Sequence, residues 1–131
     1  MSTLNTNNDV ATFLTAAGQY TSDVLVEDWN VNPQAKLYKK LVMEEFIELM
    51  EAWDDGDVVE VADAIGDTIW VLQGLALSAG IPMQQVWDEI ARSNLAKIDS
   101  VTGKVLKRAD GKVQKPEGWT PPDIESIINK T

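Results

Sequence analysis

Six carboxylates stand in two short clusters of this sequence. One cluster lies in EEFIE at positions 44–48 and the other in EVADAIGD at positions 60–67. The six are Glu44, Glu45, Glu48, Glu60, Asp63 and Asp67. Spacings of three and four residues put carboxylates on adjacent turns of a helix, so two facing helices can direct them at one cation. Histidine and cysteine are absent, so oxygen ligands would hold that cation, which favours Mg²⁺, Mn²⁺ or Ca²⁺ over zinc.

The charge around these clusters supports a metal site. The chain has no lysine or arginine between Lys40 and Arg92. Crowded carboxylates raise one another's pKa and destabilise a fold unless a cation lies among them. For the first cluster there is a simpler interpretation, because an amphipathic helix with a broad apolar face around Phe46 and Ile47 can carry its acids in solvent.

Apolar periodicity predicts the helices that position these clusters. We expect helices over residues 9–19, 33–53, 57–79 and 82–97, and a short one over 124–129. Asp9 and Asn32 are the expected N-caps, and Gly56 and Gly80 are expected to end the two long helices. The third helix is apolar almost all round after residue 69, which predicts a central position in the fold.

The chain changes character after Asp99. Gly103 and the pair Asp110-Gly111, flanked by alternating residues, predict a hairpin, and three later prolines predict irregular structure. We therefore expect an all-α, four-helix bundle-like domain over residues 1–131, with residues 100–131 as a short C-terminal hairpin or irregular extension.

Composition limits the class of protein. A chain of 131 residues fits one domain, and 44% hydrophobic residues argue against an acidic disordered chain. A net charge of −10 argues against a duplex-binding surface, so no nucleic acid is expected as a partner. No apolar run is long enough to span a bilayer, and MSTLNTNND lacks the features of a secretion signal. We expect no membrane contact and a cytoplasmic location.

The ordered motifs resemble those of a known group of enzymes. EEFIE, then EVAD, then VWDEIARSNLAK and GKVLKRADGKVQKPEGWTPPDI are similar to the MazG-like all-α nucleoside triphosphate pyrophosphohydrolases. They look most like the phosphoribosyl-ATP pyrophosphohydrolase-like proteins common in phages and bacteria, over about residues 36–124. The resemblance implies a MazG-type fold, a homodimer or homotetramer, and Mg²⁺-dependent hydrolysis of a nucleoside triphosphate to the monophosphate and pyrophosphate. Mn²⁺ is a possible substitute.

The resemblance also implies roles for the acidic residues. The implied metal ligands are Glu45, Glu48, Glu60, Asp63 and Asp67. Glu44 or Glu45 would act on the attacking water. In many relatives the second motif's aspartate lies thirteen residues before the helix-ending glycine, which here is Asp67. The second motif is therefore either Glu60 with Asp63 or Asp63 with Asp67, and Asp63 belongs to both.

Basic and aromatic residues follow the acidic motifs. We expect Arg92, Asn94 and Lys97 to contact phosphates, the last two by family likeness, although Arg92 and Lys97 could merely complement a helix dipole. Lys104 and Lys107 either fold over the phosphates or belong to a solvated hairpin. Trp119 is the best candidate to stack on a base, whereas Trp70 and Trp87 are expected in the core.

Two other functions compete with this interpretation. One is hydrolysis of phosphoribosyl-ATP, ranked lower because the tail around GKVLKRADGKVQK is not part of that enzyme's compact signature. The other is a non-enzymatic acidic protein that mimics DNA. The sequence does not identify the base or sugar of the nucleotide.

Overall fold

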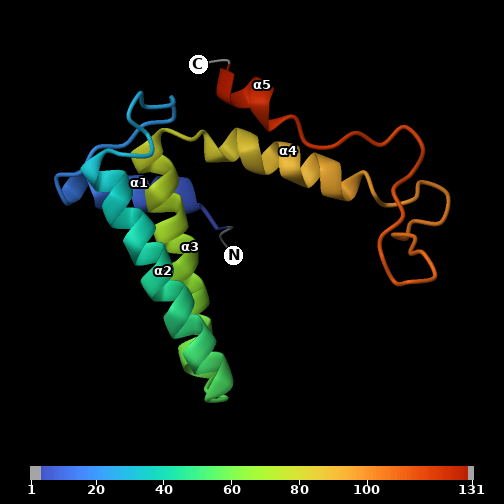
Figure 1. The fold of residues 1–131 in the computed structure, drawn as a ribbon, viewed down its shortest axis with the longest axis horizontal. Helices are drawn as coiled ribbons and strands as arrows, with labels where there is room; N and C mark the ends of the chain where they lie inside the picture. Colours follow the sequence, from blue (N-terminus) through green and yellow to red (C-terminus); the bar gives the residue numbers. More distant parts are fainter. Residues whose placement is uncertain (1–3, 130–131) are drawn as a thin grey trace. The chain divides into compact units, whose positions relative to one another are not determined.

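The computed structural model describes residues 4–129, and within them all regular structure is helical (Figure 1). The helices are α1 (Thr6–Ala16), α2 (Pro33–Asp54), α3 (Val58–Ala79), α4 (Met83–Leu95) and α5 (Ile124–Asn129). The predicted all-α class is confirmed. No single helix in the described residues is long and apolar enough to cross a membrane; α3 and α4 meet that test only as a pair joined by a break.

The chain divides into two compact units, with the boundary between Met83 and Gln84. The first unit holds α1, α2 and α3, and the second holds nearly all of α4, the C-terminal segment and α5. The expectation of one domain over the whole chain stays a prediction.

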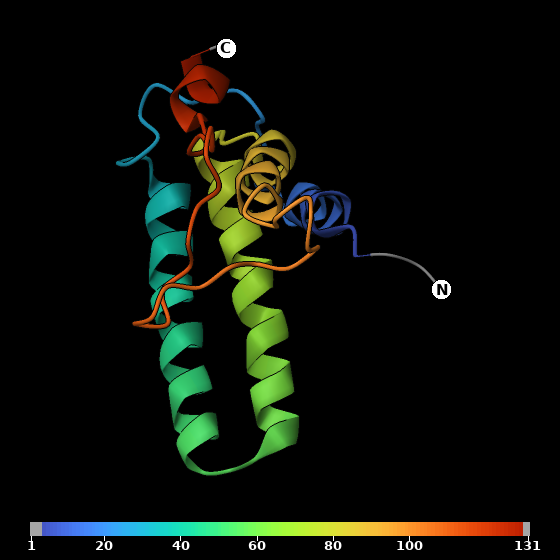
Figure 2. The ribbon, with the colours of Figure 1, turned by 90° about the vertical axis from the view of Figure 1, so that its right-hand side faces the viewer.

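The α2–α3 hairpin positions the acidic clusters, and its ends are where the sequence places them. Asn32 caps α2 by accepting a hydrogen bond from the Ala35 N–H, and Pro33 fits the first helical turn, which needs no backbone donor. Gly80 ends α3 in the left-handed conformation, with φ of 81°. The two helices run side by side (Figure 2), and the Tyr38 ring lies where a side chain at Gly74 would be.

The core of the first unit is small. It is formed by Val10 and Leu14 from α1, Tyr38 from α2, and Val71 and Leu77 from α3. The second half of α3 is largely buried, as its apolar character predicts. The N-cap of α1 is Asn5 and not Asp9, because the helix begins before the apolar residues that were used to locate it. Asp9 lies in its first turn.

Much of the apolar surface of α2 and α3 is not covered within one chain. Phe46 is 49% exposed and Ile47 is 48% exposed on α2, while Ile65 and Leu72 are similarly exposed on α3. Trp70 is 37% exposed, so its predicted place in the core is wrong for the single chain. Both helices of the hairpin therefore leave apolar side chains exposed in the single chain.

The second unit is a helix followed by a long irregular segment. Two isolated antiparallel bridges, Ile98 with Val105 and Lys107 with Val113, stand where one hairpin was predicted. In the described residues these bridges do not extend into strands, which agrees with an irregular extension. Trp87 on α4 is 63% exposed, so its predicted core position is also wrong.

Candidate functional site

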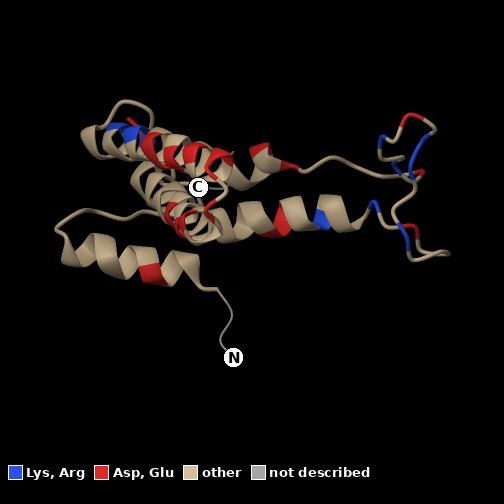
Figure 3. Cartoon of the chain, turned by 90° about the horizontal axis from the view of Figure 1, so that it is seen from below, with Lys and Arg blue, Asp and Glu red and all other residues tan. Residues whose placement is uncertain are grey.

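Four of the six acidic residues interact across α2 and α3. Burial raises the pKa of Glu45, and the charges of Glu48, Asp67 and Asp63 raise it further. Burial also raises the pKa of Asp67, followed by the charges of Asp63 and Glu48. Figure 3 shows the acidic positions grouped along α2, after its lysine-bearing first turns. We call Glu45, Glu48, Asp63 and Asp67 the carboxylate cluster.

Helix geometry explains how the sequence builds this cluster. Glu45 and Glu48 are three residues apart on α2, and Asp63 and Asp67 are four apart on α3, so each pair occupies adjacent turns. Ala64, between the two aspartates, is buried. A side chain this small lets the helices approach closely, which brings acids from both helices together.

The residues of the cluster carry the oxygen donors that a divalent cation prefers. The Glu45 Oε2 atom is buried and has no hydrogen-bond partner among the described residues. The ion pairs in those residues, Arg92 with Glu89 and Arg108 with Asp110, lie elsewhere in the chain. A buried, unpaired carboxylate oxygen is unfavourable unless a cation or donor reaches it. Within residues 4–129 no group of three acidic side chains has the geometry of a metal site, so a metal would need other rotamers of these side chains.

Glu60 and Glu44 lie outside the cluster. Glu60 faces a hollow of about 220 Å³ at the turn between the two helices, lined by Glu48, Glu51, Ala52, Asp55, Asp57 and Glu60. Its backbone N–H donates to Asp57 Oδ1 in the first turn of α3. Among the described carboxylates, those that act on Glu45 are Glu48, Asp67 and Asp63. Glu60 is not among them, which supports Asp63 with Asp67 as the second motif, and the register itself stays a prediction. Glu44 is exposed to solvent on α2.

Sequence comparison agrees with this arrangement. A family-wide sequence model for phosphoribosyl-ATP pyrophosphohydrolase matches residues 18–94, more than half of the chain and both acidic motifs. The chain belongs to this family. The phosphoribosyl-ATP pyrophosphohydrolase family lies within the MazG-like all-α superfamily, so the resemblance seen in the sequence is confirmed. Membership indicates a nucleotide pyrophosphohydrolase. Comparison with curated proteins gives no match.

The family match ends at Asn94, and the predicted phosphate contacts cluster around that point. Arg92 forms an ion pair with Glu89, with Nε 2.6 Å from Oε1, and its Nη2 donates to the carbonyls of Thr120 and Pro121. The donors of Arg92 therefore hold the C-terminal segment onto α4, a role that the sequence did not suggest.

The other predicted phosphate contacts make fewer interactions. Lys97 Nζ donates to Asn94 Oδ1 at 3.0 Å. Lys104 and Lys107 are exposed on the segment after α4, as a solvated segment would have them. Whether any of these four residues contacts substrate stays a prediction.

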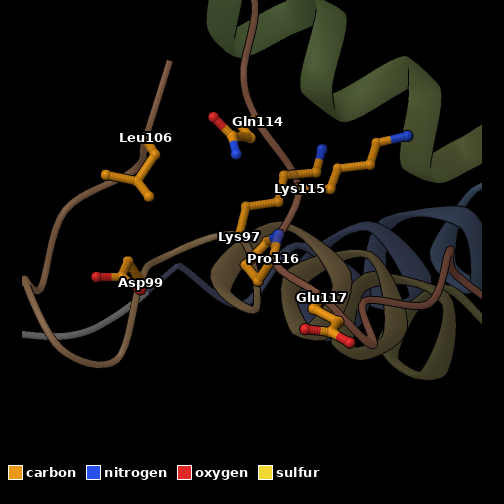
Figure 4. A pocket seen from close by; sticks show the side chains of 7 residues that line it. All are labelled: Lys97, Asp99, Leu106, Gln114, Lys115, Pro116 and Glu117. Atoms are coloured by element: carbon orange, nitrogen blue, oxygen red, sulfur yellow. The ribbon is translucent and has the colours of Figure 1, made fainter. Parts of the chain in front are cut away.

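Lys115 lies beside the Trp119 ring, a contact that the sequence did not predict. Lys115 Nζ lies 4.5 Å from the centre of the Trp119 ring, next to a hollow that it lines with Lys97 (Figure 4). The turn in KPEGW creates this contact, because the Trp119 N–H donates to the Pro116 carbonyl and Gly118 adopts a φ of 79°. Pro116 and Gly118 in that motif were the sequence features from which this turn could have been predicted.

Proposed function

We propose that this protein hydrolyses a nucleoside triphosphate between its α and β phosphates, with Mg²⁺ held by the carboxylate cluster. The observation that carries the proposal is the buried, unpaired Glu45 Oε2 atom, on a carboxylate whose pKa is raised by acids of both helices. Family membership supports the reaction class. Glu45, Glu48, Asp63 and Asp67 would supply the ligands, and Mn²⁺ could replace Mg²⁺ because both accept oxygen ligands.

The chain's own residues suit attack by water. A bound Mg²⁺ would lower the pKa of a water and offset charge on phosphoryl oxygens. The chain has neither cysteine nor histidine, so a carboxylate must accept the proton of the attacking water. Glu44 adjoins the cluster in sequence and is exposed. We assign Glu44 this proton-accepting role, with Glu45 as the other candidate.

Phosphoribosyl-ATP is the second candidate substrate, because the matching family carries its name. We place it after the nucleoside triphosphates, since residues 95–131, which include an ordered segment tied to α4, lie outside the match. Both substrates release pyrophosphate from the same kind of bond.

Pyrophosphate release with Mg²⁺ tests the function. The panel contains the canonical ribo- and deoxyribonucleoside triphosphates, damaged nucleotides, (p)ppGpp-type alarmones and phosphoribosyl-ATP. We expect turnover with at least one nucleoside triphosphate, loss of turnover in EDTA, and a Tm that rises with Mg²⁺ or Mn²⁺. Turnover of phosphoribosyl-ATP alone would select the second candidate. No turnover, together with a Tm indifferent to both metals, would favour the acidic DNA mimic.

We also propose that the protein is an oligomer, at least a dimer. The apolar residues left exposed on α2 and α3 support this, because exposed apolar patches of this kind mark association surfaces. A second copy offers the same helices, so a symmetric contact can cover both faces at once.

A further inference from the structure

In the second unit, two lysines approach one tryptophan ring. Lys97 Nζ is 5.4 Å and Lys115 Nζ is 4.5 Å from the centre of the Trp119 ring. Each contact is a favourable cation–π interaction, and the two together give this part of the chain two positive charges. Within residues 4–129 neither lysine forms an ion pair with a carboxylate. The fold thus places two cations, neither of them paired with a carboxylate of the described residues, beside one ring and one hollow.

Contacts independent of the lysines hold this arrangement in place. Trp119 Nε1 donates to the carbonyl of Ser93, which is 3% exposed, at 2.7 Å. Arg92 donates to the carbonyls of Thr120 and Pro121, at 3.3 and 3.1 Å. The ring is therefore held at the end of α4 by its own hydrogen bond, and the backbone that follows it is held by Arg92. Both lysines thus contact a ring whose position does not depend on them.

A hollow adjoins the two lysines. It has a volume of about 230 Å³, and Figure 4 shows its seven lining residues: Lys97, Asp99, Leu106, Gln114, Lys115, Pro116 and Glu117. The Asp99 carboxylate accepts a hydrogen bond from the Thr102 N–H at 2.8 Å and so closes its own turn. Glu117 is exposed and forms no ion pair among the described residues, so Glu117 and the ionised Asp99 are the two acids that oppose an anion here.

We propose that this hollow binds a phosphate group between the ammonium groups of Lys97 and Lys115, with the Gln114 amide as a further donor. Ammonium groups bind phosphate as point charges, and two of them can share one anion. The site lies wholly within the second unit and uses no metal. The proposal rests on the proposed function only for the identity of the ligand that carries the phosphate group. That ligand is either a nucleotide or free pyrophosphate.

Calorimetric titration with inorganic pyrophosphate in EDTA, at low ionic strength, tests the site on the full chain. We expect binding to the wild type, and Lys115→Gln should weaken it by about tenfold through the loss of one close charge. Lys115→Arg should restore most of the affinity, and Glu117→Gln should tighten binding. Lys112→Gln is the matched control, because Lys112 is an exposed lysine of the same segment that does not line the hollow. Circular dichroism confirms that each variant folds.

Equal weakening by Lys115→Gln and Lys112→Gln, or no pyrophosphate binding by the wild type, would overturn the proposal. A parallel titration with an α,β-imido nucleoside triphosphate identifies the ligand that carries the phosphate group. Tighter binding of the nucleotide, with the same sensitivity to Lys115→Gln, assigns the site to substrate; tighter binding of pyrophosphate assigns it to product. These measurements involve no turnover, so they can fail while pyrophosphate release succeeds, and the reverse.

Discussion

Burial raises the pKa of Glu45 on α2, and the carboxylate of Asp67 on α3 raises it further across the interface between the two helices. Such an interface is normally stabilised by apolar contact, and here it brings like charges together. The arrangement opposes folding whenever both groups are ionised without a counter-ion. A divalent cation would convert this unfavourable contact into a favourable one. The proposed function would therefore be linked to stability at the same atoms.

The linkage predicts how stability depends on pH. The pKa values of Glu45 and Asp67 in the folded chain lie above their ordinary values of 4.5 and 3.8. The folded state therefore binds protons more tightly than the unfolded state, and stability falls as pH rises from the ordinary values through the raised ones. In EDTA, we expect the Tm to decrease over that interval, and Glu45→Gln to reduce the decrease. Differential scanning calorimetry of both proteins measures it. An identical pH profile in the variant would contradict the assignment.

The helices were predictable because each has a local signal. Asn32 with Pro33 starts α2, and Gly80 ends α3, whatever the rest of the chain does. The environment of the acids was not predictable to the same degree. A helical wheel places Phe46 on the inner face and Glu45 on the outer, yet Phe46 is half exposed and Glu45 has a buried oxygen facing α3. Which face of an amphipathic helix is covered depends on partners that one sequence does not specify.

Neutralising one acid of the cluster separates function from stability. We expect Glu48→Gln and Asp63→Asn each to lower pyrophosphate release by at least about 100-fold, because each removes a ligand and its charge. In EDTA both variants should melt at the same temperature as the wild type or higher, since repulsion is reduced. Turnover and melting curves are measured on the same preparations.

The control for these two variants is Asp54→Asn. Asp54 is an exposed acid at the end of α2 and lines neither the cluster nor the hollow at the turn. Turnover should stay within about twofold of the wild type, as expected of a surface substitution. If Glu48→Gln and Asp63→Asn were as active as Asp54→Asn, the site would lie elsewhere.

A comparison of Glu60 with Asp67 decides the register of the second motif. The charge of Asp67 acts on Glu45, whereas Glu60 lines the hollow at the turn. We expect Asp67→Asn to lose activity by about 100-fold and to need more Mg²⁺ for half-maximal rate, as loss of a ligand requires. Glu60→Gln should change neither quantity by more than about twofold. Mg²⁺ titrations of the initial rate provide both numbers, and the opposite ranking would restore Glu60 with Asp63 as the motif.

The exposed apolar face predicts an effect on assembly. Phe46 is 49% exposed near the middle of α2, and a charge there would be buried in any contact that covers this face. Phe46→Glu should therefore lower the molar mass in solution from that of an oligomer towards that of one chain, as measured by light scattering after size exclusion. Val101→Glu should not, because Val101 is 90% exposed on the second unit's irregular segment. A wild type that elutes as a monomer would remove the proposed association.

The contacts at the end of α4 predict how firmly the C-terminal segment is held. Arg92 binds the carbonyls of Thr120 and Pro121, and hydrogen bonds from a charged group are stronger than neutral ones. Arg92→Ala should speed hydrogen exchange at the Trp119 amide, which donates to the Pro116 carbonyl, by about tenfold or more. Arg108→Ala is the control, because Arg108 pairs with Asp110 in its own turn. Exchange followed by NMR resolves that single amide. If both variants exchanged like the wild type, the bond from Trp119 Nε1 to Ser93 would hold the segment without Arg92, and the role of Arg92 would be confined to its pair with Glu89.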